Sequence, residues 1–442
     1  MQRQKTIAKW LSVVLLTTIA IASYILLSTI GKSAPSDSAV AGAGNTTFQT
    51  DVPTPPLVYS TLPRACETID GLNVAHVGGS SQDTIIDYAN FCGKTLVFFR
   101  SQSNDRDVKE SGLYAAVFDS QTTLESTIKI ADENAKYLAS SMGKNGLTVF
   151  IQNQEKTDVI LFSDEMKIGA KTSLDRYDSI TPVSSVEGLY LCFDSECMRM
   201  LKIDGALNAT YDNFVYQSSD ITIVETFYIN GKTLIFAQDT NFVKILQYSQ
   251  ESGFICHFSQ DKSTLLQVLP IVASNEQTFV TLIKSQDALT VNSFDIDLHA
   301  LQSRTLPSSD KAVMLTTDIG IEVLCGSDII RYCPHLDFLA KSEIANPQLV
   351  ENSTEYHSVC GADNYFISKT PNGFVLLKKT GDNLSQIFAC NGDVFPLVQA
   401  VKTVDNSMRF SLFFDCENTE DFSYMCFGST DAFYLSLTTS PT

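Results

Sequence analysis

The chain has 442 residues, 44% of them hydrophobic, and a formal net charge of −19. Negative charge on this scale repels nucleic acid and anionic lipid headgroups, so we expect no nucleic-acid partner. The simplest role of this negative charge is to keep a large domain soluble.

The first predicted element is a membrane-spanning helix at residues 10–30. This segment contains no charged residue, and roughly 20 apolar residues suffice to cross a hydrocarbon core of about 30 Å. Because Arg3, Lys5 and Lys9 precede it, the positive-inside rule makes residues 1–9 a cytoplasmic tail. We expect a single-pass membrane protein whose C-terminal ectodomain is extracellular or extracytoplasmic. The alternative, a cleaved signal peptide, has a shorter apolar region of about 7 to 15 residues.

A flexible stalk is predicted at residues 31–56. Pro35, Pro53, Pro55 and Pro56 lie here among Ser, Ala, Gly and Thr, without apolar periodicity. A flexible coil of this length separates its ends by on the order of 30 Å. The stalk would therefore lift the ectodomain clear of the membrane.

Residues 57–442 have the pattern of an all-β domain. Short runs of β-branched and aromatic residues are separated by turn-forming Gly, Asn, Asp and Ser. The clearest unit follows Gly231, with strands expected at 232–237, 242–248 and 254–258. Hairpin openings recur about every 44 residues, the period of a four-stranded propeller blade. The openings are at Gly93, Gly146, Gly188, Gly231, Phe279, Gly320, Tyr365 and Phe410.

The last unit lacks room for a fourth strand. Its expected strands are 410–414, 422–427 and 433–437. We expect a strand from the N-terminal part of the ectodomain, at 57–61 or 84–88, to complete this blade and close the ring. The pattern favours eight blades, with seven if one hairpin is an insertion. The alternative fold is a series of separate β-sandwiches.

In this layout the chain resembles β-propellers in general over residues 57–437, without matching one propeller family. The only tryptophan is Trp10, which excludes Trp-Asp repeats and the tryptophan motifs of bacterial sialidases and quinoproteins. Anchor, stalk and cysteine-containing propeller are similar in plan to viral attachment glycoproteins and neuraminidases. Because fold does not determine function, this resemblance implies a layout only.

The cysteines indicate disulfides. All 11 follow the predicted anchor, in the compartment where disulfides persist. The odd number leaves at least one thiol unpaired or paired between chains. No C-x2-C occurs and the five histidines are scattered, so we expect no zinc and no cofactor. Cys192 and Cys197 flank a predicted hairpin turn, where a disulfide could join facing strands.

Four Asn-x-Ser/Thr sequons are candidate glycosylation sites if a eukaryotic cell makes the protein. They begin at Asn45, Asn208, Asn352 and Asn383.

Arginines from different repeats are the sharpest indication of an enzyme. In a sialidase-like glycosidase, such arginines converge on a substrate carboxylate. Their convergence at the ring centre would indicate a glycan-directed protein, although each is more simply a solvated charge or half of an ion pair. The six candidates for a weak anion site are Arg100, Arg176, Arg199, Arg304, Arg331 and Arg409.

No set of residues identifies a catalytic mechanism, so the expected function is a non-enzymatic, membrane-anchored platform that binds a protein or glycan ligand. The alternatives are a glycan-directed receptor-binding protein or glycosidase, and a structural subunit of a membrane complex. An exposed apolar face would mark the last of these.

Overall fold

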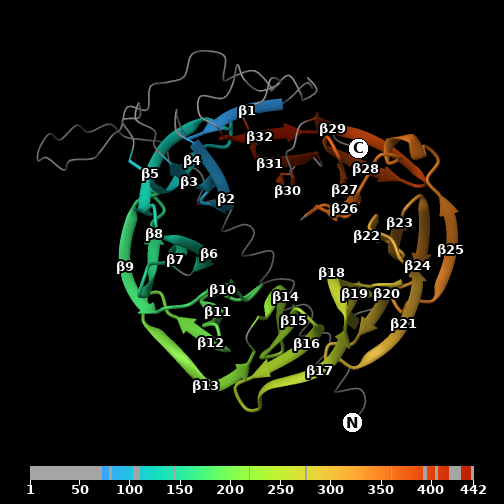
Figure 1. Ribbon diagram of the computed structural model, residues 1–442, viewed down its shortest axis with the longest axis horizontal. Coiled ribbons are helices and arrows are strands. Elements are labelled where there is room, and N and C mark those ends of the chain that lie inside the picture. The colour runs from blue at the N-terminus through green and yellow to red at the C-terminus, as the bar shows by residue number, and fades with distance from the viewer. Residues whose placement is uncertain are drawn as a thin grey trace, which may run out of the picture. The chain divides into compact units, whose positions relative to one another are not determined.

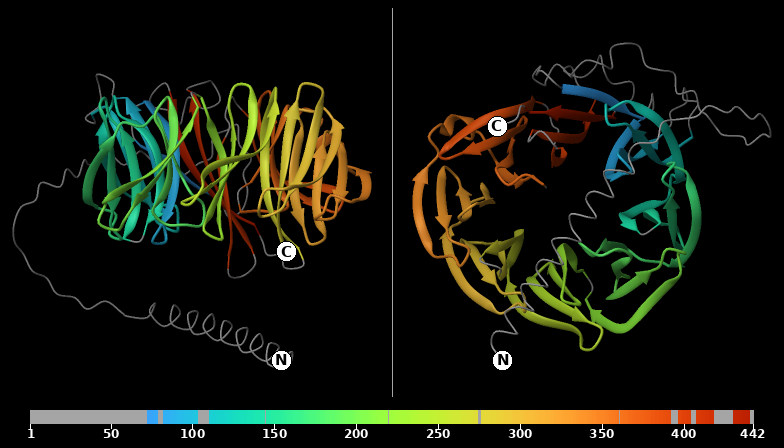
Figure 2. Two further views of the ribbon diagram at one scale, coloured as in Figure 1. Left: turned by 90° about the horizontal axis from the view of Figure 1, so that it is seen from below. Right: turned by 180° about the vertical axis from the view of Figure 1, so that it is seen from behind.

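A computed structural model shows eight four-stranded antiparallel sheets placed as blades around one axis (Figure 1). Seen edge-on, the blades form a short ring whose strands run between its two faces (Figure 2). The predicted all-β propeller of eight four-stranded blades is therefore confirmed. The structure describes residues 72–78, 82–102, 110–143, 145–218, 220–273, 276–359, 361–391, 396–403, 407–417 and 430–439.

Blades 1 to 7 each use four consecutive strands, with the first strand innermost (Figure 1). Blades 1 to 4 comprise β2 (Gln82–Phe91), β3 (Lys94–Gln102), β4 (Gly112–Phe118), β5 (Leu124–Asp132); β6 (Lys136–Gly143), β7 (Gly146–Gln152), β8 (Lys156–Phe162), β9 (Ile168–Asp175); β10 (Ser179–Pro182), β11 (Leu189–Phe193), β12 (Cys197–Ile203), β13 (Ala209–Gln217); and β14 (Thr222–Ile229), β15 (Lys232–Gln238), β16 (Phe242–Ser249), β17 (Gly253–Asp261).

Blades 5 to 7 continue this order, and a short 3-10 helix, Pro347–Leu349, precedes blade 7. Their strands are β18 (Ser263–Ala273), β19 (Glu276–Ser285), β20 (Ala288–Phe294), β21 (Ala300–Pro307); β22 (Ala312–Thr317), β23 (Gly320–Cys325), β24 (Asp328–Tyr332), β25 (Phe338–Glu343); and β26 (Glu355–Ser358), β27 (Tyr365–Thr370), β28 (Gly373–Thr380), β29 (Asn383–Asn391).

Blade 8 joins the two ends of the propeller. Its order from the inside is β30 (Leu397–Lys402), β31 (Met408–Glu417), β32 (Thr430–Thr438) and β1 (Leu72–Val77). β1 pairs antiparallel with β32, with Leu72 opposite Leu437. Closure by a strand from the N-terminal part of the ectodomain is confirmed, and it leaves no blade short of a strand.

The segments predicted to form that blade need correction. Residues 84–88 belong to β2, the innermost strand of blade 1, so they do not close the ring. The other candidate, 57–61, lies outside the described residues, as does the expected strand 422–427. Blade 8 already has four strands without either segment.

The position of a strand within its blade explains its hydrophobic pattern. Middle strands are covered by neighbouring blades on both sides, so every residue of β4 and of β7 is buried. The outermost strand β21 has only one buried residue, Leu306. Each of the eight described hydrophobic clusters joins two neighbouring blades, and together they form a continuous core around the ring.

A five-residue turn recurs between the third and fourth strands of five blades. Its fourth residue has positive φ, although it is not glycine, and its side chain is buried. In three of these turns the first residue is an aspartate whose carboxylate accepts backbone N–H groups within the turn, which offsets the strained conformation. The positive-φ residues are Thr122, Met166, Leu207, Leu298 and Leu336.

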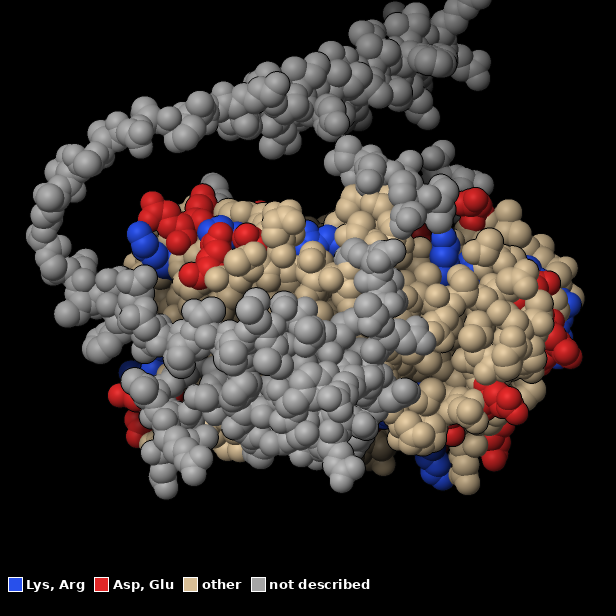
Figure 3. Space-filling view, turned by 90° about the horizontal axis from the view of Figure 1, so that it is seen from above, with Lys and Arg blue, Asp and Glu red and all other residues tan. Residues whose placement is uncertain are grey.

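Within the part of the chain that the structure describes, no helix combines the length and apolar character needed to cross a membrane. The predicted tail at 1–9, anchor at 10–30 and stalk at 31–56 lie outside the described residues. On the side of the ring seen in Figure 3, uncharged residues cover most of the described surface and charged residues gather toward the margins.

Candidate functional site

The inner sides of blades 5, 6 and 7 enclose a hollow of about 400 Å³, which we call the inner hollow. It lies where the innermost strands β18, β22 and β26 begin. Lys284 at the end of β19 and Asp310 in the connection before β22 complete its wall. The inner hollow therefore combines residues from three blades.

Gln267 sets the spacing between blades 5 and 6 at the inner hollow. Its side-chain carbonyl accepts the backbone N–H of Met314 at 2.8 Å, and its side-chain amide donates to the carbonyl of Met314 at 3.0 Å. The register of β18 shifts between Leu265 and Gln267. Such a bulge re-aims side chains, and the intervening Leu266 is 39% exposed in the wall of the inner hollow.

The inner strand of blade 7 contributes an acidic and a basic group. Glu355 and His357 are two residues apart on β26, and their side chains meet at 3.1 Å. The intervening Tyr356 is buried and donates through its hydroxyl to the carbonyl of Gly326 in blade 6 at 2.9 Å. This bond fixes β26 against the neighbouring blade, so Glu355 and His357 stand on a rigid element.

The wall of the inner hollow contains one ion pair and one contact between a carboxylate and an imidazole. Lys284 forms an ion pair with Asp310, and Glu355 lies beside His357. Ser358 follows His357 on the strand, and successive strand residues point to opposite faces, so the two do not form a nucleophile–base pair. The arrangement suits reversible binding of a ligand with both hydrogen-bond donors and acceptors.

The six arginines named as candidates for an anion site do not meet at the ring centre. None of the six is on an innermost strand. Arg100 on β3 donates to the carbonyl of Ala135 at 2.6 Å, and Arg176 donates to the carbonyl of Gln154 at 3.2 Å. These contacts tie strands and connections of the ring together.

Three more of the predicted arginines also have local partners. Arg199 on β12 pairs with Asp194 at 3.0 Å. Arg304 on β21 donates to the carbonyl of Leu336 at 2.9 Å, and Arg409 on β31 donates to the Ser436 hydroxyl at 3.0 Å.

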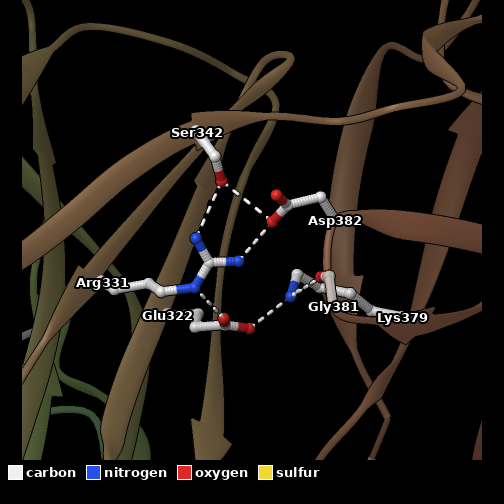
Figure 4. Close-up of polar contacts among 6 residues, drawn as sticks. All are labelled: Glu322, Arg331, Ser342, Lys379, Gly381 and Asp382. Carbon is white, nitrogen blue, oxygen red and sulfur yellow. Dashed lines mark hydrogen bonds and ion pairs between the residues drawn. The ribbon is translucent and has the colours of Figure 1, made fainter.

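Arg331 is the centre of a partly buried charge network between blades 6 and 7 (Figure 4). Its Nε donates to Glu322 at 2.7 Å, and its other nitrogens contact Ser342 and Asp382. Lys379 of blade 7, whose side chain is 3% exposed, pairs with the second oxygen of Glu322. Hydrogen bonding to Arg331 lowers the pKa of Asp382. We interpret the network as a structural link between the two blades, because every charge in it faces an opposite charge.

The predicted Cys192–Cys197 disulfide is wrong, because both thiols are free. The strand register explains this: Arg199 stands opposite Cys192, while Asp194 and Cys197 face each other at the turn. Burial raises the pKa of the Cys192 thiol. The remaining free thiols among the described residues are Cys92, Cys256, Cys325 and Cys333, whereas Cys390 is disulfide-bonded.

The sequon asparagines Asn208, Asn352 and Asn383 are exposed on turns or strand ends. Asn45 lies outside the described residues. Among the residues that the structure describes, no group of three His, Cys, Asp or Glu side chains could hold a metal ion.

The residues of the inner hollow were not predicted from the sequence. Gln267 is an ordinary amide within an apolar strand, and its partner Met314 belongs to the next repeat. The only local signal was the Glu-x-His pattern at Glu355 and His357. It puts these two polar side chains on one face of the strand, while Tyr356 between them lies on the other face.

No protein-family model matches the chain, and no curated protein matches it. Among solved structures, the Dos1 propeller is 12% identical, with a TM-score of 0.48, covering 82% of this chain and 94% of that one. Kluyveromyces lactis Hsv2 is 9% identical, with a TM-score of 0.41, covering 69% of this chain and 98% of that one. A prolyl endopeptidase is 8% identical, with a TM-score of 0.42, covering 76% of this chain and 55% of that one. At these identities no function is transferred.

Proposed function

We propose that the protein is a membrane-anchored, extracytoplasmic binding platform whose inner hollow holds a segment of a protein ligand. The observation that carries this proposal is the inner hollow itself: about 400 Å³, lined from three blades, with an ion pair and a Glu–His contact in its wall. A ligand pocket of about 300–1,000 Å³ with a few fixed polar groups is typical of binding sites.

The rigidity of the wall supports the proposal. Gln267 ties blade 5 to blade 6, and Tyr356 ties blade 7 to blade 6. A site whose polar groups are held in place loses less conformational entropy when it binds. The Lys284–Asp310 ion pair and the Glu355–His357 contact favour a ligand that presents both hydrogen-bond donors and acceptors, as a polypeptide loop does.

Site-specific crosslinking in the protein's own cells tests this function. A photoreactive amino acid at position 266, in the wall of the inner hollow, should give a discrete protein adduct with the full chain. The same probe at position 343, on the outermost strand β25, is the control. His357→Ala should reduce the adduct at position 266 several-fold. Equal labelling from both positions, or no adduct from 266, would contradict the proposed function.

A further inference from the structure

A second cavity of about 450 Å³ lies between the outer parts of blades 4 and 5, and we call it the outer groove. On one side it is lined by Phe258 and Gln260 of the outermost strand β17. On the other it is lined by β20 and the outermost strand β21, including Asn292 and Leu301. The outer groove is on the circumference of the ring, separate from the inner hollow.

The floor of the outer groove contains a polar side chain whose hydrogen-bonding capacity is unused. Asn292 is only 6% exposed, and its amide nitrogen has no hydrogen-bond partner. Its cross-strand neighbour Thr281 is fully buried, and the Thr281 hydroxyl is also unpartnered. A buried donor without an acceptor costs about 1–3 kcal/mol. The packing of the two blades does not supply a hydrogen-bond acceptor for Asn292, so a ligand in the outer groove could supply it.

The chemistry of the lining identifies the kind of acceptor. No charged side chain lines the outer groove, although the chain as a whole has a net charge of −19. The remaining polar groups are neutral, including Gln260 and Gln302, and Phe258, Phe294 and Leu301 provide apolar contact. A charged group would lose its hydration here without gaining a partner. A neutral carbonyl next to an apolar side chain satisfies both parts of the lining.

The backbone around the outer groove favours a polypeptide over other neutral molecules. β17 and β21 are the outermost strands of their sheets, so one edge of each lacks a neighbouring strand. An extended peptide can pair with such an edge while its side chains enter adjacent pockets. Leu301 on β21 is 46% exposed and would contact an apolar side chain of the peptide.

We propose that the outer groove binds an extended, uncharged polypeptide segment of a partner protein, with Asn292 donating to a backbone carbonyl and the phenylalanine-lined wall accepting an apolar side chain. This site is additional to the inner hollow and does not depend on the function proposed for it.

Binding of blocked peptides to the full-length protein in detergent tests the proposal. The probes are acetyl-Ala-X-Ala-amides with X as Leu, Ile, Val, Phe or Met, at concentrations up to about 10 mM, the range expected for so small a ligand. The readout is the side-chain amide resonance of Asn292 in asparagine-labelled protein, assigned by its loss in Asn292→Leu. At least one of these peptides should shift this resonance with saturation, and the charged control peptide acetyl-Ala-Asp-Ala-amide should not.

Variants keep the test specific. The affinities of the variants are measured by calorimetric titration, which does not depend on the Asn292 resonance. Asn292→Leu should weaken the best peptide at least about 10-fold, the equivalent of one lost hydrogen bond, while remaining folded by circular dichroism. The matched control is Gln217→Leu, which changes an exposed amide on the outermost strand of blade 3 and should leave the affinity unchanged. The proposal is overturned if no peptide binds or if Asn292→Leu binds the best peptide equally well.

Discussion

The interface between blades 6 and 7 and the interface between blades 4 and 5 share a sheet geometry but use polar groups differently. At the first, Glu322 and Lys379 are buried, Arg331 is partly buried, and each has an opposite charge as partner (Figure 4). At the second, Asn292 is buried with its donor unpaired. Both interfaces have an apolar cluster. The difference shows that buried polar groups can hold one pair of blades together through ion pairs, and can leave a hydrogen-bond donor without a partner between another pair.

The largest expected effect comes from breaking the charge network. Glu322→Ala leaves Lys379 buried without its carboxylate and removes one partner of Arg331. We expect the free energy of unfolding to fall by about 3–5 kcal/mol, the usual cost of an uncompensated buried charge. Equilibrium denaturation measures it, with exposed Glu343→Ala as the control. A loss below about 1 kcal/mol would show that the network does not lock the two blades.

A double variant separates charge from shape at the same interface. Glu322→Leu combined with Lys379→Met removes one charge of each sign and leaves Arg331 with Asp382 and Ser342. Because apolar residues can replace a buried pair at little cost, we expect the double variant to be more stable than Glu322→Ala.

The interface where the ring closes is expected to respond to pH. Burial, with the charge of nearby Asp83, raises the pKa of Asp415 to about 6, although its carboxylate accepts the backbone N–H of Ile85. The folded state therefore binds this proton more tightly than the unfolded chain, whose carboxyl has an ordinary value of 3.8. The stabilisation is complete below about pH 4 and is lost as the pH rises through about 6.

Asp415→Asn isolates this effect. The asparagine carbonyl can still accept from Ile85, but it carries no charge at any pH. The variant should gain up to about 3 kcal/mol over the wild type between pH 4 and pH 7. Denaturation of both proteins across this range measures the difference, and parallel pH curves would contradict the raised pKa.

At the interface of blades 4 and 5, the sign of the effect should reverse. Asn292→Leu replaces an unpaired amide with an apolar group of similar size. We expect a gain in stability of about 1 kcal/mol, because the cost of the unsatisfied donor disappears. Thermal and chemical denaturation measure it. A destabilised variant would mean that the amide already has a partner, and the contrast between the two interfaces would then fail.

The smallest effect is expected at the rim of the same interface. Lys232 of blade 4 and Asp297 of blade 5 form an exposed ion pair at 2.8 Å, and hydrogen bonding to Lys232 lowers the pKa of Asp297. Exposed pairs are screened by solvent and salt. Asp297→Asn should leave the unfolding midpoint unchanged within error at physiological salt, and a clear loss would show that this pair holds the blades together.

Blade number and strand order could be predicted because they are local. Each hairpin opening, such as Gly231, combines turn residues with strand-forming runs, and no distant information is needed. The closing strand could not be predicted in the same way. Leu72–Val77 pairs with residues at the other end of the chain, from Ala432 to Leu437, and several short N-terminal segments have equally suitable local patterns.

The candidate sites were missed for a related reason. Gln267 and Asn292 are neutral amides inside strands, and their roles arise only from what the neighbouring strand or blade offers. The Cys192–Cys197 pairing failed because closeness in sequence around a turn does not set which residues face each other. The recurrent turn that places Leu207 and Leu298 at positive φ was a real repeat signal, but it involves too few residues to stand out.

The closing strand also determines how the propeller meets mechanical load. Tension applied at Leu72 itself acts first on the bonds between β1 and β32, from Leu72 and Leu437 to Val77 and Ala432. Detaching β1 would open blade 8 while the other seven blades keep all their strands. An experiment that pulls the propeller from Leu72 should therefore record the rupture of this single ladder first.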